Sequence, residues 1–233
     1  MRGQVVHVLA SNGMKAVVED LRPRIERRIG HPLAIDYGST TGLLGKVDQG
    51  APFDVAILTS QGVDELVKKG KVSAASRADF AQSGIGLAVR AGAPKPDIAT
   101  PAALKKTLES AASITYAGDG ASRPSIDKML ERLGLMPKIK AKTILTQGSG
   151  AAMASVAAGR VPVVMTLLSE LLPVKGIDVV GLLPAEFQGY IRFGAGVAAQ
   201  PAQPGAAKAI VAFLKSEQAL PVYSAKGMEL IHK

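Results

Sequence analysis

The sequence predicts an α/β protein in which strands and helices alternate along the chain. Short apolar runs rich in β-branched residues recur, and apolar residues at helical spacing follow most of them. At several of the joints between a predicted strand and the following helix, glycine stands together with a serine or threonine. This alternation is typical of a parallel sheet covered by helices. The elements form two sets of about equal size, before and after a strand expected at residues 84–90.

The first set begins with a buried strand at residues 5–10, where VVHVLA runs into Ser11, Asn12 and Gly13. A helix follows, because apolar residues recur at positions 14, 17, 18, 21 and 25 with charged residues between them. Two more strands are expected at residues 33–37 and 54–58. A helix follows each of them, one beginning near Leu43 and one over residues 61–69.

The second set follows a proline-rich connection at residues 91–100. Its first helix spans residues 101–108, with Thr100 as the cap and Pro101 in the first turn. Another helix over residues 125–133 ends at Gly134, as a C-terminal cap predicts. The remaining strands are expected at residues 114–117, 142–145, 161–167, 179–182 and 190–199, and the remaining helices at residues 151–158, 205–214 and 217–226.

Composition excludes several classes of function. The 233 residues are 47% hydrophobic and 20% charged, which is typical of a folded chain. No cysteine is present and the three histidines are scattered, so we expect no metal site and no cofactor. No apolar run approaches about 20 residues, so direct membrane insertion is not expected. The net charge of +9 raises the question of nucleic acid, but aromatic residues are 4% and tryptophan is absent, so no nucleic-acid partner is expected.

The amino terminus shows no apolar segment typical of a secretory signal. The protein is therefore cytoplasmic if Met1 is its native start, or it is the mature part of an exported protein.

Four joints between a strand and a helix carry candidate ligand-binding residues: Ser11, Asn12, Thr40, Thr41, Ser122, Arg123 and Ser149. A helix N-terminus presents unpaired N–H groups and a partial positive charge, and glycine lets the backbone approach a ligand. Several such helix ends together predict a site for a small anion. Ordinary helix capping by serine and threonine is the alternative interpretation.

Arg123 is the charged member of this set. A guanidinium can bind a carboxylate through two hydrogen bonds, but it can equally form a surface ion pair, here with Asp119 or Asp127. Glu170 and Glu186 follow late strands, and surface or capping roles are expected for both. No catalytic residue is identified from the sequence.

Three segments carry a resemblance to a known family: GAPFDVAILTS at residues 50–60, LPAEFQ at 183–188 and VYSAKGMEL at 222–230. The chain resembles periplasmic molybdate-binding proteins, the substrate-binding components of ABC transporters. It is most similar to a branch that includes aconitate-isomerase-like proteins. The resemblance implies the type II periplasmic-binding-protein fold, with residues 1–83 plus 194–233 as lobe one, residues 84–193 as lobe two and a ligand cleft between them.

By position, the resemblance implies that the hydroxyls of Ser11 and Thr40 bind the ligand. Ser122 falls at a third contact, mainly a backbone amide, and Ser149 falls near a fourth. The tyrosine that molybdate binders carry in this region is replaced by Thr166 or Leu167. This change, together with Arg123, favours a carboxylate ligand over molybdate.

The leading hypothesis is therefore an extracytoplasmic, periplasmic solute-binding protein for a small anion, with an ABC transporter membrane component as its partner. The anion is a di- or tricarboxylate, or a molybdate-like oxyanion. The alternative is an isomerase of a small tricarboxylic acid that uses the same cleft. The effector domain of a transcription regulator shares this fold, but it would need a helix-turn-helix segment that this chain lacks.

Overall fold

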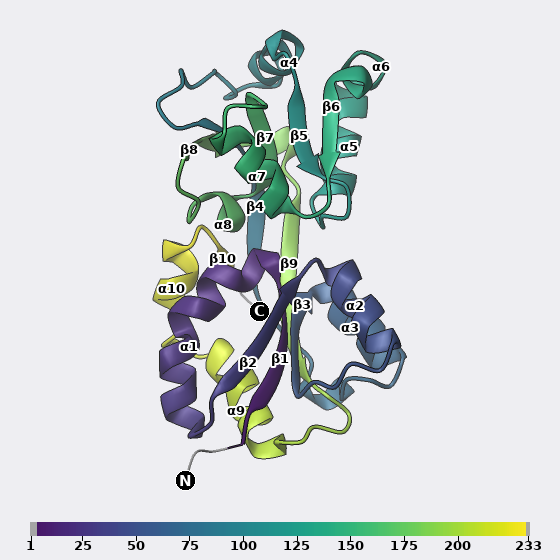
Figure 1. The fold of residues 1–233 in the computed structure, drawn as a ribbon, viewed down its shortest axis with the longest axis vertical. Coiled ribbons are helices and arrows are strands. Elements are labelled where there is room, and N and C mark those ends of the chain that lie inside the picture. The colour runs from purple at the N-terminus through teal and green to yellow at the C-terminus, as the bar shows by residue number, and fades with distance from the viewer. Residues whose placement is uncertain (1–3, 232–233) are drawn as a thin grey trace. The chain divides into compact units, whose positions relative to one another are not determined.

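A computed structural model describes residues 4–231 and shows two compact units. Unit 1 comprises the described residues up to Gln82 and those from Arg192 onward, and unit 2 is Ser83–Ile191. Two neighbouring strands, β4 (Ala78–Arg90) and β9 (Tyr190–Val197), have residues in both units. The other helices and strands each belong to one unit (Figure 1).

Unit 1 is a sheet with helices on both sides. Its further elements are β1 (Val6–Ser11), β2 (Leu33–Gly38), β3 (Val55–Thr59), β10 (Glu229–Leu230), α1 (Lys15–Ile29), α2 (Thr40–Asp48), α3 (Ser60–Lys68), α9 (Pro204–Leu214) and α10 (Leu220–Ala225). The strand order is β2-β1-β3-β9-β4, with β10 beside β4. Helices α1, α9 and α10 lie on one side of this sheet, and α2 and α3 lie on the other (Figure 1).

Helix α1 shows how the apolar pattern positions a helix. Val17, Val18, Leu21 and Ile25 recur at helical spacing, and all four are buried. The helix ends at Gly30, whose φ of 71° is in the left-handed region that favours glycine. On the other side of the sheet, apolar residues of β1, β3, α2 and α3 form one buried cluster, which includes Leu9, Leu43, Leu58, Val63 and Leu66.

Unit 2 repeats the arrangement of a sheet covered by helices. Its elements besides β4 are β5 (Ile114–Ala117), β6 (Thr143–Thr146), β7 (Val163–Leu167), β8 (Ile177–Leu182), α4 (Pro101–Ser110), α5 (Arg123–Arg132), α6 (Met136–Ile139), α7 (Ser149–Ala157) and α8 (Leu168–Leu171). The strand order is β4-β7-β5-β6, with β8 also beside β4. Residues of β4, α7, β7 and α8 form the buried cluster beneath α7, including Ala88, Val156, Val164 and Leu171.

The α/β class is confirmed, but the expectation of a purely parallel sheet is wrong. β1 is parallel to β2 and β3, and β5 is parallel to β6 and β7. In contrast, β9 runs antiparallel to β3, and β4 runs antiparallel to β7 and β8. The strand expected at residues 84–90 also begins earlier, at Ala78. Its added part pairs with β10 through Gln82 and Glu229.

Candidate functional site

The candidate residues of unit 1 lie where β1 ends and where α2 begins. Ser11 is the last residue of β1 and is paired with Gly38 of β2, so it lies beside the segment that leads into α2. Asn12, which is partly buried, opens the short 3-10 helix Asn12–Met14. Ser11 is 5% exposed and occupies the capping position of this helix, yet its side chain accepts no capping hydrogen bond. The Ser11 hydroxyl is therefore not used in the way that the capping interpretation predicts.

Capping at α2 is performed by a residue outside the candidate set. Ser39 Oγ accepts a hydrogen bond from Gly42 N at 3.1 Å, which leaves Thr40 and Thr41 without this role. Thr40 Oγ1 accepts from Thr59 N at 3.3 Å, so the Thr40 hydroxyl keeps its proton to donate elsewhere. Thr41 is exposed. Ser11, Asn12, Thr40 and Thr41 are called the hydroxyl cluster of unit 1 below.

The end of β3 is a joint that sequence reasoning missed. Thr59 caps α3 by accepting from Gly62 N at 3.2 Å, and Ser60 follows it. The signal was present, because the hydroxyl pair Thr59 and Ser60 stands at the strand end with Gly62 two residues further on, and the other joints also combine hydroxyl residues with glycine. The Ser60 hydroxyl donates to Asp79 Oδ1 at 2.7 Å and so has a structural partner.

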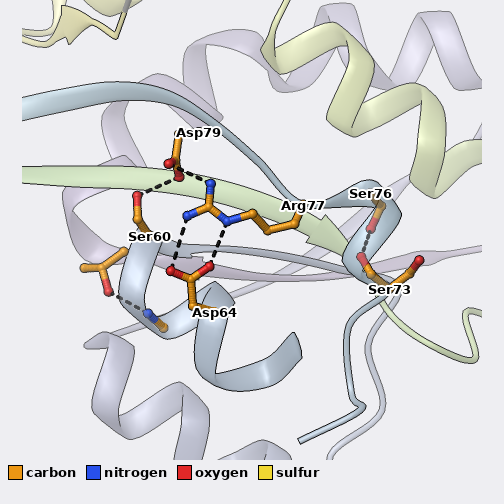
Figure 2. A network of polar contacts seen from close by, with 8 residues as sticks. Ser60, Asp64, Ser73, Ser76, Arg77 and Asp79 are labelled. Carbon is orange, nitrogen blue, oxygen red and sulfur yellow. Dashed lines mark hydrogen bonds and ion pairs between the residues drawn. The ribbon is translucent and has the colours of Figure 1, made fainter. Parts of the chain in front are cut away.

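Figure 2 shows the polar network that fixes this part of unit 1. Arg77 lies between two carboxylates, with 2.6 Å from its Nη1 to Asp79 Oδ2 and 2.8 Å from its Nε to Asp64 Oδ1. The hydrogen bond to Asp64 is the main cause that raises the pKa of Arg77. Through Ser60 and Asp64 on α3, and Asp79 on β4, the network ties helix α3 to the start of β4.

Gly194 passes close to this network, and we expect Gly194→Ala to destabilise the protein by about 2–3 kcal/mol. A Cβ at Gly194 would lie 2.6 Å from Asp79 Oδ1 and 2.7 Å from Ala78 O, so backbone would have to move. Gly45→Ala in α2 is the matched control, because a Cβ there meets nothing within 4 Å. The control is expected to be neutral or stabilising. Urea unfolding measures both, and equal stability of the two variants would contradict the close approach.

The candidate residues of unit 2 lie in two loops that are hydrogen-bonded to each other. β5 and β6 run side by side and end together, with Ala117 paired to Thr146. Beyond them, Gly118 N donates to Thr146 O at 2.8 Å, and Gly148 N donates to Asp119 Oδ1 at 2.7 Å. The loops therefore form one surface, which carries the N-termini of α5 and α7.

Ser122, Arg123 and Ser149 stand on these loops and are called the arginine cluster of unit 2 below. Ser122 is 3% exposed, and its side chain makes no capping bond to α5. Ser149 is buried and begins α7, directly after Gly148 with its φ of 77°. The structure thus brings these three residues into two adjoining loops, as the pattern of joints predicts.

The contacts of Arg123 confirm the surface ion pair, and ligand binding by its guanidinium stays a prediction. Arg123 Nη1 donates to Gly118 O at 2.6 Å, and Nε lies 3.3 Å from Asp127 Oδ2, which is the expected ion pair. Asp127 Oδ1 in turn accepts from the buried Tyr116 hydroxyl at 2.7 Å. These contacts hold the guanidinium in place, while 43% of the Arg123 side chain stays exposed and can bind a ligand.

The expectation of a surface role for Glu170 is wrong, but that of a capping role is confirmed, because Glu170 in the first turn of α8 accepts from the backbone of Leu167, the N-cap residue of that helix. Glu170 is partly buried and accepts hydrogen bonds from Ser149 Oγ at 2.9 Å, from Thr166 Oγ1 at 2.5 Å and from Leu167 N. Burial raises its pKa, and these three hydrogen bonds oppose that shift. Sequence reasoning missed this contact because Ser149 and Glu170 are 21 residues apart.

Glu170 also changes what its two hydroxyl partners can do. When Glu170 is ionised, Ser149 Oγ donates its proton to the Glu170 carboxylate. In this protonation state, Ser149 offers a ligand only its backbone N–H as a donor. Thr166, one of the two residues in the region where molybdate binders carry a tyrosine, likewise donates its hydroxyl proton to Glu170.

The hydroxyl cluster of unit 1 offers neutral donors, and the arginine cluster of unit 2 offers neutral donors and the cation of Arg123. This is chemistry suited to a small anion that carries acceptor oxygens. Among residues 4–231, no group of three or more histidine, cysteine, aspartate or glutamate side chains could hold a metal ion. No helix within that range is both long and apolar enough to cross a membrane.

Comparisons with known proteins agree with this chemistry. A family model described as bacterial extracellular solute-binding protein matches residues 6–229. An aconitate isomerase from a Pseudomonas species is 34% identical over 230 residues, covering 95% of this chain and 86% of that protein. The molybdate-binding protein ModA of Azotobacter vinelandii is 28% identical over 234 residues, covering 97% of this chain and 90% of that protein.

The fold is likewise that of solved binding proteins. The structure of the Azotobacter vinelandii periplasmic molybdate-binding protein matches with a TM-score of 0.83 at 19% identity, covering 97% of this chain and 100% of that one. This match shows a shared periplasmic-binding-protein fold and confirms the predicted fold class. The family model and the two relatives above confirm the family resemblance that the sequence predicts.

Proposed function

Because the chain belongs to the family of bacterial extracellular solute-binding proteins, we propose that its solute is a small carboxylate anion. The observation that carries this proposal is Arg123. Its guanidinium is held by Gly118 O and Asp127, stands beside the buried Ser122 and remains partly exposed. A planar guanidinium matches the two oxygens of a carboxylate.

The remaining contacts in this proposal are neutral. Ser11 and Thr40 donate their hydroxyl protons, Asn12 and Thr41 lie beside them, and Ser122 and Ser149 contribute donors at the starts of α5 and α7. Neutral donors spread over several helix ends suit an anion with more than one acidic group. In this proposal unit 1 and unit 2 serve as the two lobes of the binding protein.

The family also supports a proposal for location and partner. A bacterial extracellular solute-binding protein acts outside the cytoplasm. We place this chain in the periplasm as a proposal, with the membrane component of an ABC transporter as the partner that receives the bound anion.

A thermal-shift panel tests the proposal, with citrate, cis-aconitate, trans-aconitate, molybdate, tungstate and sulfate as ligands. A ligand at about 100 times its Kd stabilises a protein by about 2.7 kcal/mol. For a chain of this size that raises Tm by roughly 5–10 °C. We expect this increase with one or more of the carboxylates. An increase with molybdate and tungstate alone would contradict the proposal.

A second candidate is an isomerase of a small tricarboxylic acid, which the 34% identity to the aconitate isomerase over 95% of the chain favours. Shifting a double bond requires a base that removes a proton from one carbon and an acid that returns a proton at the other end of the allylic system. Proton NMR of cis-aconitate with the protein distinguishes the two functions. Conversion to trans-aconitate would establish turnover, whereas binding with no conversion would leave the binding function alone.

A further inference from the structure

Glu170 is an ionisable side chain hydrogen-bonded to Ser149 of the arginine cluster of unit 2, and the proposed contacts to an anion do not use it. Its carboxyl is held by hydrogen bonds from α7, from the end of β7 and from the backbone of Leu167. Ser149 supplies the contact from α7, and Ser149 is also a proposed ligand contact. A single residue therefore separates the Glu170 carboxyl from the bound anion.

The protonation state of Glu170 decides what Ser149 can donate. While Glu170 is ionised, the Ser149 proton points to Glu170 Oε1 and is lost to the ligand. Once a proton from solvent binds the Glu170 carboxylate, Glu170 can donate to Ser149 Oγ. The Ser149 proton is then free to turn to the anion. The same step removes a negative charge next to the place where the anion binds.

We propose that anion binding at the arginine cluster is coupled to the uptake of one proton by Glu170, which makes Glu170 a residue that sets affinity and pH range. This inference rests on the proposed function. The protein takes up the anion and one proton from solvent, no covalent bond other than the new O–H bond of Glu170 forms, and the released Ser149 hydroxyl provides one more hydrogen bond to the anion.

The neighbouring charges favour uptake of a proton. Burial is the main cause that raises the pKa of Glu170, the hydrogen bonds from Thr166, Ser149 and Leu167 oppose it, and the charge of Asp119, which accepts from Gly148 N, adds to the rise. Helix α7 and strand β7 carry no charged residue. On β8, Asp178 accepts from Gly92 N. Arg123 begins α5, and Asp127 on the same helix pairs with it.

Isothermal titration with cis-aconitate tests the inference. Titrations are run from pH 5.5 to pH 8 in pairs of buffers with different heats of ionisation, and the buffer dependence of the heat counts the protons taken up. Three proteins are compared: the unchanged chain, Glu170→Gln and Glu186→Gln. Glu186 is an exposed acid of the same unit that pairs with Arg132, so it is a matched control.

The unchanged chain and Glu186→Gln are expected to take up close to one proton more per anion than Glu170→Gln does. The ligand's own protons cancel in this difference. Affinity of the unchanged chain falls by up to tenfold per pH unit as pH rises above the pKa of Glu170, because the ionised form binds less well. Glu170→Gln, which mimics the protonated form, lacks this part of the pH dependence and binds more tightly at pH 8.

Two results would overturn the inference, and they differ in whether the proposed function also fails. Equal proton uptake by the unchanged chain and Glu170→Gln, with binding intact, would refute the role of Glu170 and leave the proposed function standing. No binding of any carboxylate by the unchanged chain would refute both. Tm values of the three proteins show that the variants are folded.

Discussion

Replacing Ser11 and Thr40 together by alanine is expected to weaken carboxylate binding by about 100-fold or more. A hydrogen bond to a charged group contributes about 1.5–3 kcal/mol, and two such bonds are lost. Ser11 Oγ makes no capping bond, and the Thr40 hydroxyl keeps its proton while accepting from Thr59 N. Isothermal titration with the best ligand of the thermal-shift panel measures the loss.

Two further variants keep this experiment specific. Ser110→Ala removes an exposed hydroxyl bonded to Lys106 O in unit 2, and it is expected to leave affinity unchanged. Ser11→Ala alone is expected to lower affinity roughly tenfold or more without removing a hydrogen bond that Thr59 N needs. Unchanged affinity in the double variant would show that the hydroxyl cluster of unit 1 does not bind the ligand.

Asp54→Ala is expected to lower the free energy of unfolding by about 3–5 kcal/mol. Asp54 is 1% exposed, and its carboxylate accepts from His7 N at 2.8 Å and from Gln203 N at 3.0 Å. Its side chain thereby ties β1 to the segment that follows β9. Alanine leaves both part-buried N–H groups without their partner, and each such loss costs about 1–3 kcal/mol.

Urea unfolding of Asp54→Ala beside Asp48→Ala checks this expectation. Asp48 is a surface carboxylate paired with Lys69, and its removal is expected to change stability little. Asp54→Asn, which keeps one acceptor, should lie between Asp54→Ala and the unchanged chain. A loss for Asp54→Ala no larger than for Asp48→Ala would contradict the structural role of the buried carboxylate.

Local signals in the sequence predicted most elements of the fold. The strand β1, which ends at Ser11, and the helix α5, whose end is followed by Gly134 with positive φ, were visible because burial, capping and turn formation depend on neighbouring residues. The direction of each strand relative to its neighbours could not be predicted from such local signals. β9 is as apolar as a parallel strand would be, so its antiparallel pairing with β3 follows from contacts distant in sequence.

The candidate site likewise has features that neighbouring residues predict and features that depend on contacts distant in sequence. The joints at Ser11, Thr40, Ser122 and Ser149 lie at strand ends or helix starts, as their glycines and hydroxyls predict. That these residues bind a ligand stays a prediction. The Glu170 contact to Ser149 could not be read from the sequence, because it depends on how β6, β7 and the helices after them pack. The Thr59 joint could have been found by the same rule as the others.

Carboxylate binding by the two clusters is tested most directly by NMR mapping of backbone amides in the isotope-labelled protein during titration with cis-aconitate or citrate. We expect the largest chemical-shift changes in both clusters, at Ser11, Thr40, Ser122, Arg123 and Ser149, and we expect these changes to saturate with one common Kd. Saturable changes confined to other residues, such as those around the exposed Arg90 and Arg160 of unit 2, would show that the proposed site is wrong.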